Sequence, residues 1–326
     1  MGRTVITKQE VKRQIERLKK EKAPGGDGIK NEAWLYGTEE VIDRLTEIMN
    51  EVWKGKGFPR QWTEGVICPI HKKGNTKEAQ NYRGITLLNT SYKLYAMVLG
   101  ERMKEEIERK GILPDSQAGF RMGRGTIDNV YILNHIVEKE IQKKAGKVYA
   151  LFVDLKATFD SVNREKLWEY LRGKGVSKEL VKNTKEIYEE TKNKVKLNGK
   201  ESEWFWTKGG LRQGCPLSPT LFTIYLSDID EMLKKAQAGR VPVGREKVWC
   251  LAYADDLVLV ANEERGMKDM IRNAERYMKK KKLEVNVDKT KMMIFRKERG
   301  RAKESEWKWT ERKIEQEKEF KYLGCL

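Results

Sequence analysis

The sequence predicts an α+β fold with a small, mostly antiparallel sheet flanked by helices. Stretches with apolar residues at helical spacing dominate the first 140 or so residues, and short apolar runs typical of buried strands begin near residue 148. Strands and helices then mix without the strict alternation of a doubly wound sheet. The chain has 326 residues, 39% of them hydrophobic, which is enough for one large domain or two ordinary ones.

Helix-start signals and helical periodicity place the helices. Thr7 and Glu10 have capping-box spacing, so a helix should start there and end at the Ala-Pro-Gly-Gly sequence of residues 23–26. Residues 66–74 are expected to form a loop-rich, basic stretch between two of the helices. Further helices are expected over residues 38–53, near Thr90, near Thr126, and over residues 164–172, 178–190, 219–235 and 267–277.

Strands are predicted from short apolar runs and turn residues. Residues 148–153 form a continuous apolar run that is typical of a buried strand. Asn198-Gly199 lies between residues 195–197 and 204–206 and predicts a β-hairpin. Residues 248–252 and 257–261 should pair across a turn at Asp255-Asp256, and a last strand is expected near 292–295.

Charge and composition narrow the partners. The formal net charge of +18 favours a polyanionic partner such as nucleic acid, although a lysine-rich solvated surface also explains it. No stretch is apolar enough to span a bilayer and the N-terminus is charged, so we expect a soluble intracellular protein, nuclear or cytoplasmic, with no membrane partner. The four cysteines form no C-x-x-C pair, which argues against structural zinc and a disulfide framework.

Carboxylates stand at the ends of two predicted strands. Asp154 follows the strand of residues 148–153, and Asp255 and Asp256 stand in the hairpin turn. Ionised carboxylates beside apolar strands lose hydration, and adjacent ones repel each other. A pair of divalent cations would relieve both costs, and Mg²⁺ suits carboxylate oxygens combined with phosphates. An ordinary Asx turn explains an isolated Asp-Asp sequence equally well.

Eight segments of the chain can be compared with known sequence motifs. They are residues 22–28 (KAPGGDG), 81–88 (NYRGITLL), 117–121 (QAGFR), 152–162 (FVDLKATFDSV), 210–219 (GLRQGCPLSP), 253–256 (YADD), 286–291 (NVDKTK) and 322–324 (YLG). In this order they resemble the motifs of reverse transcriptases, and most of all those of the non-LTR (LINE-type, Jockey-like) retrotransposon branch. The resemblance covers nearly the whole chain.

The resemblance implies a right-hand polymerase in two parts. Residues 1–147 would be mostly helical, basic fingers and residues 148–326 the palm, with about 163–205 partly returning to the fingers. The chain stops shortly after residue 324, so we expect the thumb to be missing. The implied enzyme is an RNA-directed DNA polymerase, a nucleotidyltransferase from a mobile element that takes an RNA template, a DNA primer and dNTPs. A truncated, non-catalytic nucleic-acid-binding remnant and an RNA-dependent RNA polymerase remain alternatives, and the oligomeric state is open.

The resemblance also implies the catalytic residues. Asp154 and Asp255 would bridge two Mg²⁺ ions, with Mn²⁺ as a substitute, while Asp256 would be an auxiliary carboxylate. The backbone carbonyl of Leu155 would add a ligand. Thr158 stands where many relatives have Ala, and we expect it to affect packing rather than chemistry.

Nucleotide-binding roles follow in the same way. Phe159 would be the bulky gate that excludes a ribose 2′-hydroxyl, with an ordinary core phenylalanine as the alternative. Arg212 is either a phosphate contact or a surface charge. Lys291 is the alternative to Lys289 near the leaving pyrophosphate. Lys72, Lys73 and Arg83 would clamp the triphosphate, although each could instead be a solvated charge. Gln213 and Gly214 would support the incoming nucleotide and the template strand.

Template and primer contacts complete the implied site. Arg121 and Arg124 should touch the template backbone. Tyr253 should lie beside the primer. Tyr322 and Gly324 fit a hairpin that supports the primer end, although plain core packing explains Tyr322 equally well.

Overall fold

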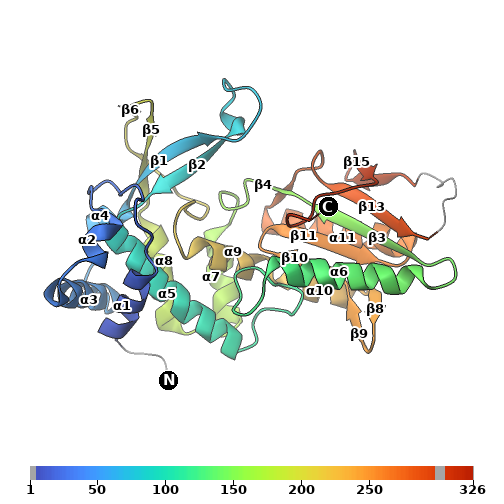
Figure 1. Cartoon of the computed structure of the whole chain (residues 1–326), viewed down its shortest axis with the longest axis horizontal. Coiled ribbons are helices and arrows are strands. Elements are labelled where there is room, and N and C mark those ends of the chain that lie inside the picture. Colours follow the sequence, from blue (N-terminus) through green and yellow to red (C-terminus); the bar gives the residue numbers. More distant parts are fainter. Residues whose placement is uncertain (1–4, 298–304, 326) are drawn as a thin grey trace. The chain divides into compact units, whose positions relative to one another are not determined.

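The computed structural model describes residues 5–297 and 305–325, and the chain divides into two compact units. The first unit comprises Met1–Lys110 and Arg164–Thr220, and the second comprises Gly111–Asn163 and Leu221–Leu326. Each unit is therefore assembled from two stretches that are distant in sequence. Both units combine helices with strands (Figure 1), which confirms the predicted α+β class.

The first unit carries helices on a small sheet. Its helices are α1 (Lys8–Glu16), α2 (Asn31–Leu35), α3 (Glu39–Trp53), α4 (Arg60–Thr63), α5 (Thr90–Arg109), α7 (Arg164–Gly173) and α8 (Lys178–Glu189), and a 3-10 turn η1 spans Ala79–Asn81. Its strands are β1 (Glu64–His71), β2 (Tyr82–Leu87), β5 (Lys192–Leu197), β6 (Lys200–Glu201) and β7 (Phe205–Trp206). The strand order is β2-β1-β5-β6, with β7 also paired to β5.

The sheet of the first unit both corrects and confirms sequence predictions. The predicted loop over residues 66–74 is wrong, because β1 occupies most of it and pairs antiparallel with β2 and parallel with β5. Pairing on both sides satisfies the β1 backbone, which outweighs the basic, loop-like composition. The hairpin around Asn198-Gly199 is confirmed, with φ of 50° and 78° at its two turn residues.

The first helix begins as predicted and ends early. The Thr7 hydroxyl accepts a hydrogen bond from the Glu10 N–H, and the Glu10 carboxylate accepts one from the Thr7 N–H, so the capping box is confirmed. Helix α1 ends at Glu16, before the predicted stop at residues 23–26. Arg102 of α5 donates to both Glu10 oxygens at 2.8 and 2.9 Å and thereby fastens α1 to α5.

The second unit is built on a six-stranded sheet in the order β10-β11-β3-β13-β15-β14, antiparallel except for the β13–β15 pair. Its helices are α6 (Thr126–Ile141), α9 (Ser218–Leu226, which begins in the first unit), α10 (Asp228–Ala236) and α11 (Glu264–Lys281). Its strands are β3 (Lys147–Val153), β4 (Leu155–Lys156), β8 (Val241–Val243), β9 (Glu246–Val248), β10 (Cys250–Tyr253), β11 (Asp256–Ala261), β12 (Glu284–Val285), β13 (Lys291–Arg296), β14 (Trp307–Trp309) and β15 (Arg312–Glu317).

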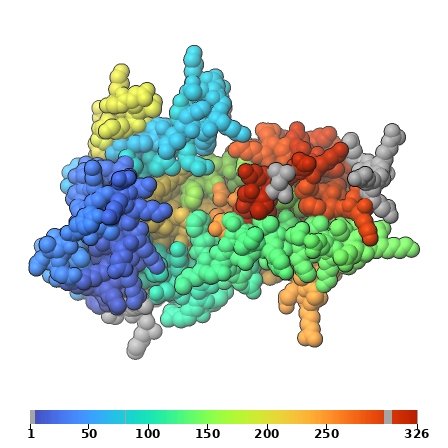
Figure 2. Space-filling view, viewed as in Figure 1, coloured from blue at the N-terminus to red at the C-terminus, as the bar shows by residue number. Residues whose placement is uncertain are grey.

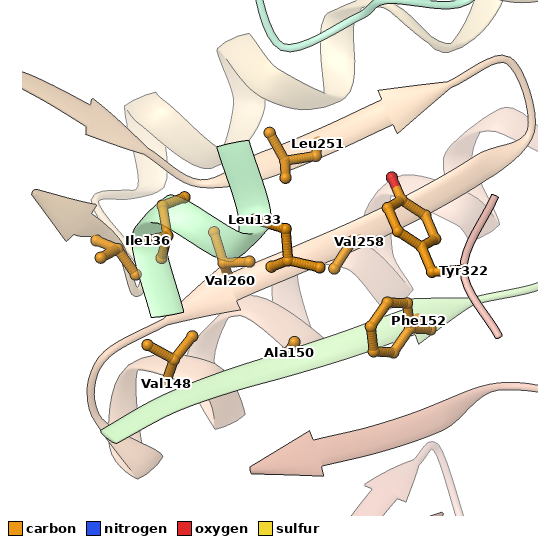
Figure 3. Close-up of a cluster of buried hydrophobic side chains, with 10 residues drawn as sticks. Leu133, Ile136, Val148, Ala150, Phe152, Leu251, Val258, Val260 and Tyr322 are labelled. Carbon is orange, nitrogen blue, oxygen red and sulfur yellow. The ribbon is translucent and has the colours of Figure 1, made fainter. Parts of the chain in front are cut away.

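The core of the second unit lies on both faces of this sheet. One face packs against α6, and Figure 3 shows Leu133 and Ile136 of that helix near Val148, Ala150 and Val260. Farther along the same face, Phe152 lies next to Tyr322. The opposite face meets α11, whose buried side chains include Met267, Met270, Ile271, Ala274 and Tyr277. Helices therefore cover both faces of the sheet whose strands lead to the acidic residues.

The predicted helix over residues 219–235 is two helices. Helix α9 ends at Leu226 and α10 starts at Asp228. The Ser227 hydroxyl donates to the Ile224 carbonyl at 2.8 Å, and such local side-chain bonds compete with the helical ladder. Separately, no helix among residues 5–297 and 305–325 is long and apolar enough to cross a membrane.

Candidate active site

The Tyr-Ala-Asp-Asp sequence forms a two-residue turn between β10 and β11. Tyr253 pairs with Asp256 across the hairpin, so Ala254 and Asp255 occupy the turn itself. Ala254 has φ of 58°, in the left-handed region that costs a non-glycine residue about 1–2 kcal/mol. Contacts from outside the hairpin must therefore stabilise this conformation.

Gln117 supplies those contacts. It is 1% exposed, and its side-chain oxygen accepts hydrogen bonds from the N–H groups of Ala254 at 3.1 Å and Gly119 at 2.8 Å. Its segment also runs beside β10, where the Ala118 N–H donates to the Ala252 carbonyl at 2.9 Å. A Cβ on Gly119 would lie 2.2 Å from the Ala254 nitrogen, so only glycine fits there.

The sequence did not predict a role for Gln117 or Gly119. Both lie in the segment of residues 117–121, where the resemblance implied a role for Arg121 alone. A buried amide is not a catalytic signal in a sequence. Its role becomes visible only once β10 lies beside it.

Asp154 stands next to the hairpin. β3 pairs with β11 so that Val153 is opposite Leu257, and one further step along each strand brings Asp154 beside Asp256. The Asp154 backbone is held by residues near the end of the chain, since its carbonyl accepts from the Asn286 N–H at 2.8 Å and its N–H donates to the Thr290 hydroxyl at 3.2 Å. The segment of residues 286–291 thus fixes the end of β3.

Asp154 and Asp256 share one face of the sheet. Side chains alternate between the two faces along each strand, so Asp154 points to the same face as Phe152, and Asp256 to the same face as Val258. Phe152 and Val258 both belong to the hydrophobic cluster in Figure 3, so the two aspartates share that face. A cavity of about 340 Å³ opens at this point. Its charged lining comes from Asp154, Asp256, Asp288, Lys289 and Lys291, and its aromatic lining from Phe152, Phe320 and Tyr322.

The carboxylates repel one another. Burial, followed by the charges of Asp255 and Asp154, raises the pKa of Asp256 to about 6. The Lys289 ammonium lies 3.9 Å from Asp154, and its side chain is 59% exposed. The carboxylate cluster therefore remains a place where added positive charge would be stabilising.

The donor set suits a hard divalent cation. Carboxylate oxygens with an adjacent backbone carbonyl are the ligands that Mg²⁺ prefers, and the raised pKa of Asp256 reflects negative charge that a cation would offset. Within residues 5–297 and 305–325, no three His, Cys, Asp or Glu side chains are already gathered closely enough to hold a metal ion. The site therefore suits a divalent cation by the chemistry of its oxygen ligands and by their positions at adjacent strand ends. Leu155, whose carbonyl was expected to add a ligand, lies in β4 opposite Val285.

Thr158 contacts the cluster directly. Its hydroxyl donates to the Asp255 carboxylate at 3.2 Å, and the side chain is 8% exposed. The expectation that Thr158 affects packing alone is therefore wrong, because the chain folds back after β4 and brings residue 158 to the hairpin. Phe159, next in sequence, is half-buried with its ring 5.6 Å from that of Phe222. A gate and a core role for Phe159 both fit this position.

The arginines expected at the template are engaged by their own loop. Arg121 is 10% exposed, and its guanidinium donates to the carbonyls of Pro114 at 2.9 Å and Gln117 at 3.2 Å. Arg124 donates to the carbonyl and the carboxylate of Asp115 at 2.8 and 2.6 Å, with its side chain 33% exposed. Arg124 is the more accessible of the two.

Residues 322–325 form a tight turn. The N–H groups of Tyr322 and Cys325 each donate to the other residue's carbonyl, and Leu323 and Gly324 both have positive φ, so the predicted hairpin is confirmed. The Tyr322 ring lies 5.3 Å from the Phe152 ring and its hydroxyl accepts from Asn129 at 3.4 Å. Burial raises the pKa of the Tyr322 hydroxyl. Tyr322 is thus a core residue that also lines the acidic cavity.

The remaining expected nucleotide contacts belong to the first unit. Lys72 and Lys73 are exposed in the loop after β1, and Arg83 is exposed on β2. The Gln213 carbonyl accepts from the Thr86 N–H at 2.7 Å, and a Cβ on Gly214 would lie 2.4 Å from the Thr86 carbonyl oxygen. Residues 213–214 are therefore fastened to the β2 strand that carries Arg83.

Side-chain contacts bear on two alternatives left open by the sequence, the role of Arg212 and the choice between Lys289 and Lys291. Arg212 is 5% exposed and donates to the carbonyls of Trp62 and Thr63, so neither a phosphate contact nor a surface charge describes it. Both lysines line the acidic cavity, but Lys291 is ion-paired with Glu315 and Glu317 of β15, whereas the exposed Lys289 ammonium lies 3.9 Å from Asp154. Lys289 is the better placed of the two.

Comparison with known proteins agrees with this geometry. The reverse transcriptase (RNA-dependent DNA polymerase) family model matches residues 70–326. The chain is 29% identical over 293 residues to a probable RNA-directed DNA polymerase from transposon BS of Drosophila melanogaster, which covers 87% of this chain and 32% of that protein. It is 26% identical over 330 residues to the RNA-directed DNA polymerase from mobile element jockey of the same species, covering 98% of this chain and 35% of that protein.

Two further similarities extend the comparison. A Pol polyprotein from type-1 retrotransposable element R2 of Nasonia vitripennis is 26% identical over 280 residues, covering 86% of this chain and 26% of that protein. The solved structure of apo telomerase from Candida tropicalis, truncated from its C-terminal domain, superposes with a TM-score of 0.53 at 16% identity, covering 82% of this chain and 57% of that chain. This chain spans about a quarter to a third of its retrotransposon relatives.

These relatives confirm the expected non-LTR branch. With the family model matching residues 70–326, they show that the chain belongs to the reverse transcriptase (RNA-dependent DNA polymerase) family.

Proposed function

We propose that this chain is an RNA-directed DNA polymerase, a nucleotidyltransferase that joins a deoxynucleotide to a primer 3′-hydroxyl. The observation that carries the proposal is the meeting of Asp154 with the Asp255-Asp256 turn at adjacent strand ends, in a member of the reverse transcriptase family. The negative charges of Asp255 and Asp154 make ionisation of Asp256 less favourable, and such a cluster suits a reaction in which divalent cations bind phosphates.

Asp154 and Asp255 would hold two Mg²⁺ ions, with Asp256 auxiliary and the Leu155 carbonyl as a further ligand. When bound, such ions polarise phosphoryl oxygens and stabilise the charge of the attacking and leaving oxygens. Thr158 would keep the Asp255 carboxylate in place through its hydrogen bond. Lys289, beside Asp154, would stabilise the leaving pyrophosphate.

The first unit would supply the fingers and the second the palm, and the exact boundary between the two stays a prediction. Arg83 would bind the triphosphate, because guanidinium groups give bidentate contacts to phosphate. Lys72 and Lys73 would add charge from the β1–β2 loop. Gln213 and Gly214 would support the incoming nucleotide, and Phe159 would exclude ribonucleotides by its bulk.

The proposed partners are an RNA template, a DNA primer and dNTPs. The surplus of 67 Lys and Arg over 49 Asp and Glu favours such polyanions. Arg124 would contact the template backbone, with Arg121 shaping the loop that presents it. Tyr253, at the end of β10, would lie near the primer, and the Tyr322–Gly324 turn would support its end.

Primer extension on poly(rA)–oligo(dT) with Mg²⁺ tests the proposal. The parent chain should incorporate dTMP, and Asp255→Asn should abolish incorporation while template binding stays within about twofold, since removing one metal ligand acts on the transition state. Template binding without any incorporation by the parent would instead support a non-catalytic remnant. Loss of binding in Asp255→Asn would show that the aspartate is structural.

Sugar selection separates the proposal from an RNA-dependent RNA polymerase. Phe159→Val removes the bulk expected beneath the ribose, so ribonucleotide incorporation should rise relative to dNTP incorporation. Equal selectivity in the parent and the variant would assign Phe159 to the core beside Phe222.

A further inference from the structure

Three consecutive aromatic residues are exposed on a hairpin of the first unit. Trp204 is 36%, Phe205 42% and Trp206 59% exposed, where aromatic side chains of this size are ordinarily largely buried. They lie on and beside β7, and Figure 2 shows the segment around residue 200, in yellow, projecting at the surface. None of the catalytic roles proposed above uses them.

Lysines on β5 share one face with the two tryptophans. Lys192 pairs with Trp206, and the same register places Lys194 opposite Trp204. The Lys192 ammonium lies 5.2 Å from the Trp204 ring centre and 5.9 Å from that of Trp206, while that of Lys194 lies 5.0 Å from Trp204. These cation–π contacts hold two indole rings side by side above a row of positive charge.

The charge on this face is only partly compensated. By strand alternation Lys196 joins Lys192 and Lys194 on the same side. Glu201 is ion-paired with Lys194 and lies 3.8 Å from Lys196. Glu64 of β1 is the register partner of Lys192 on β5. The Arg60 guanidinium lies 4.0 Å from the Glu64 carboxylate. The face therefore keeps a positive surplus next to the exposed rings.

We propose that Trp204 and Trp206, with Lys192, form a stacking site for unpaired bases of a single-stranded RNA. Exposed aromatic rings beside lysines are how proteins bind unpaired strands, because every base has a π-face and every linkage a phosphate. In a duplex the bases stack on one another and leave no face free for the indole rings, so we expect this site to bind single strands rather than duplex RNA. A protein partner fits less well, since lysine is depleted from the centres of protein interfaces. The choice of RNA over DNA rests on the proposed polymerase function.

Binding of fluorescently labelled oligo(rU) by the full chain, measured by anisotropy, tests this site. Replacing both Trp204 and Trp206 with Ala should weaken binding by about 10- to 100-fold, in line with the loss of stacking for one or two bases. Replacing both with Phe should retain affinity within about threefold. Lys192→Gln should reduce the slope of log affinity against log salt by about 0.7, the value for one phosphate of a single strand.

Tyr36→Ala is the matched control. Tyr36 is 68% exposed in the same unit and has the Lys20 ammonium 5.0 Å from its ring centre, yet it lies outside the hairpin. Its loss should change RNA affinity by less than about twofold. The circular dichroism of all variants should match the parent.

Several outcomes would overturn the stacking site. These are unchanged oligo(rU) binding by a folded double Ala variant, equal losses on duplex RNA and on single strands, or a change in oligomeric state as the sole effect, which would indicate a protein contact. Tighter binding of oligo(dT) than oligo(rU) would reject RNA as the ligand. Asp255→Asn should bind oligo(rU) like the parent, so failure of the polymerase proposal and failure of this site are separable.

Discussion

Two tight turns of this protein adopt left-handed backbone conformations and are stabilised in opposite ways. In the β5–β6 hairpin, Asn198 and Gly199 are residue types that enter this region at little cost. In the β10–β11 hairpin, Ala254 does so with a Cβ and depends on a hydrogen bond to Gln117, which is 137 residues away in sequence. The first turn is local, whereas the second exists through tertiary contacts.

The tertiary turn is the one that carries the carboxylates. Backbone strain at a site persists only where surrounding structure compensates for it, and such places concentrate at functional sites. Gln117, Gly119 and Thr158 provide that compensation from two different segments of the second unit. The position of Asp255 therefore depends on residues that carry no charge.

Among the predictions for the two turns, Gln117→Met should have the largest effect, because it removes the contact that stabilises the β10–β11 turn. Met has similar volume but only a weakly accepting sulfur, so the N–H groups of Ala254 and Gly119 lose their strong acceptor. We expect incorporation to fall about 100-fold, the scale of a catalytic group displaced by about 1 Å. The free energy of unfolding should fall by about 2 kcal/mol, as for buried donors left unsatisfied. Primer extension and urea unfolding measure the two, and full activity in a destabilised variant would contradict the positioning role.

Thr158→Val should have a smaller effect. The variant keeps the volume and removes the donor to Asp255. A hydrogen bond to a charged group is typically worth about 1.5–3 kcal/mol, so we expect kcat to fall about tenfold or more, with the KM for dTTP nearly unchanged. Thr158→Ser should restore most of the rate in the same steady-state assay. A Ser variant as slow as Val would instead point to packing.

Protonation of Asp256 should have the next largest effect and lower the rate of incorporation several-fold. Protonation removes a negative charge from the metal-binding cluster, so incorporation at fixed Mg²⁺ should decline at acid pH, and Asp256→Asn should lack this acid limb. Bound cations favour the ionised carboxylate, so the decline should begin below the metal-free pKa of about 6. The sign for stability is opposite. The folded-state pKa lies above the ordinary 3.8, so without metal Asp256 favours folding at low pH and loses this contribution as the pH rises through about 4 to 6. Urea midpoints for the parent and Asp256→Asn across pH 4–7 check this, and parallel curves would contradict it.

Asn198→Ala should have the smallest effect on activity. Placing a Cβ without Asn's local hydrogen bonding at φ of 50° should cost about 1 kcal/mol of stability. Incorporation should stay within about twofold, because the strain is local to the β5–β6 hairpin. Asn198→Gly should be nearly neutral in urea unfolding. A large loss of incorporation in Asn198→Ala would remove the contrast between the two turns.

Much of the fold was predictable where short-range signals act. The capping box at Thr7 and the Asn198-Gly199 turn were predicted because they involve residues within a few positions. The strand β1 was mistaken for a loop because its pairing with β2 and β5 comes from two distant segments. The break at Ser227 was not predicted, because the apolar pattern continues through it and the accompanying hydrogen bond from the Ser227 hydroxyl to the Ile224 carbonyl has no clear signal in the sequence.

The candidate site divides in the same way. Residue types and their spacing were enough to identify the family and to place the carboxylates at strand ends, because both are local properties of the chain. Tertiary contacts were needed to show that Gln117 holds Ala254, that Thr158 reaches Asp255, and that Arg212 is buried rather than free to bind phosphate. Each of these depends on a hydrogen bond between segments far apart in the chain, and such bonds exist only after the strands have paired.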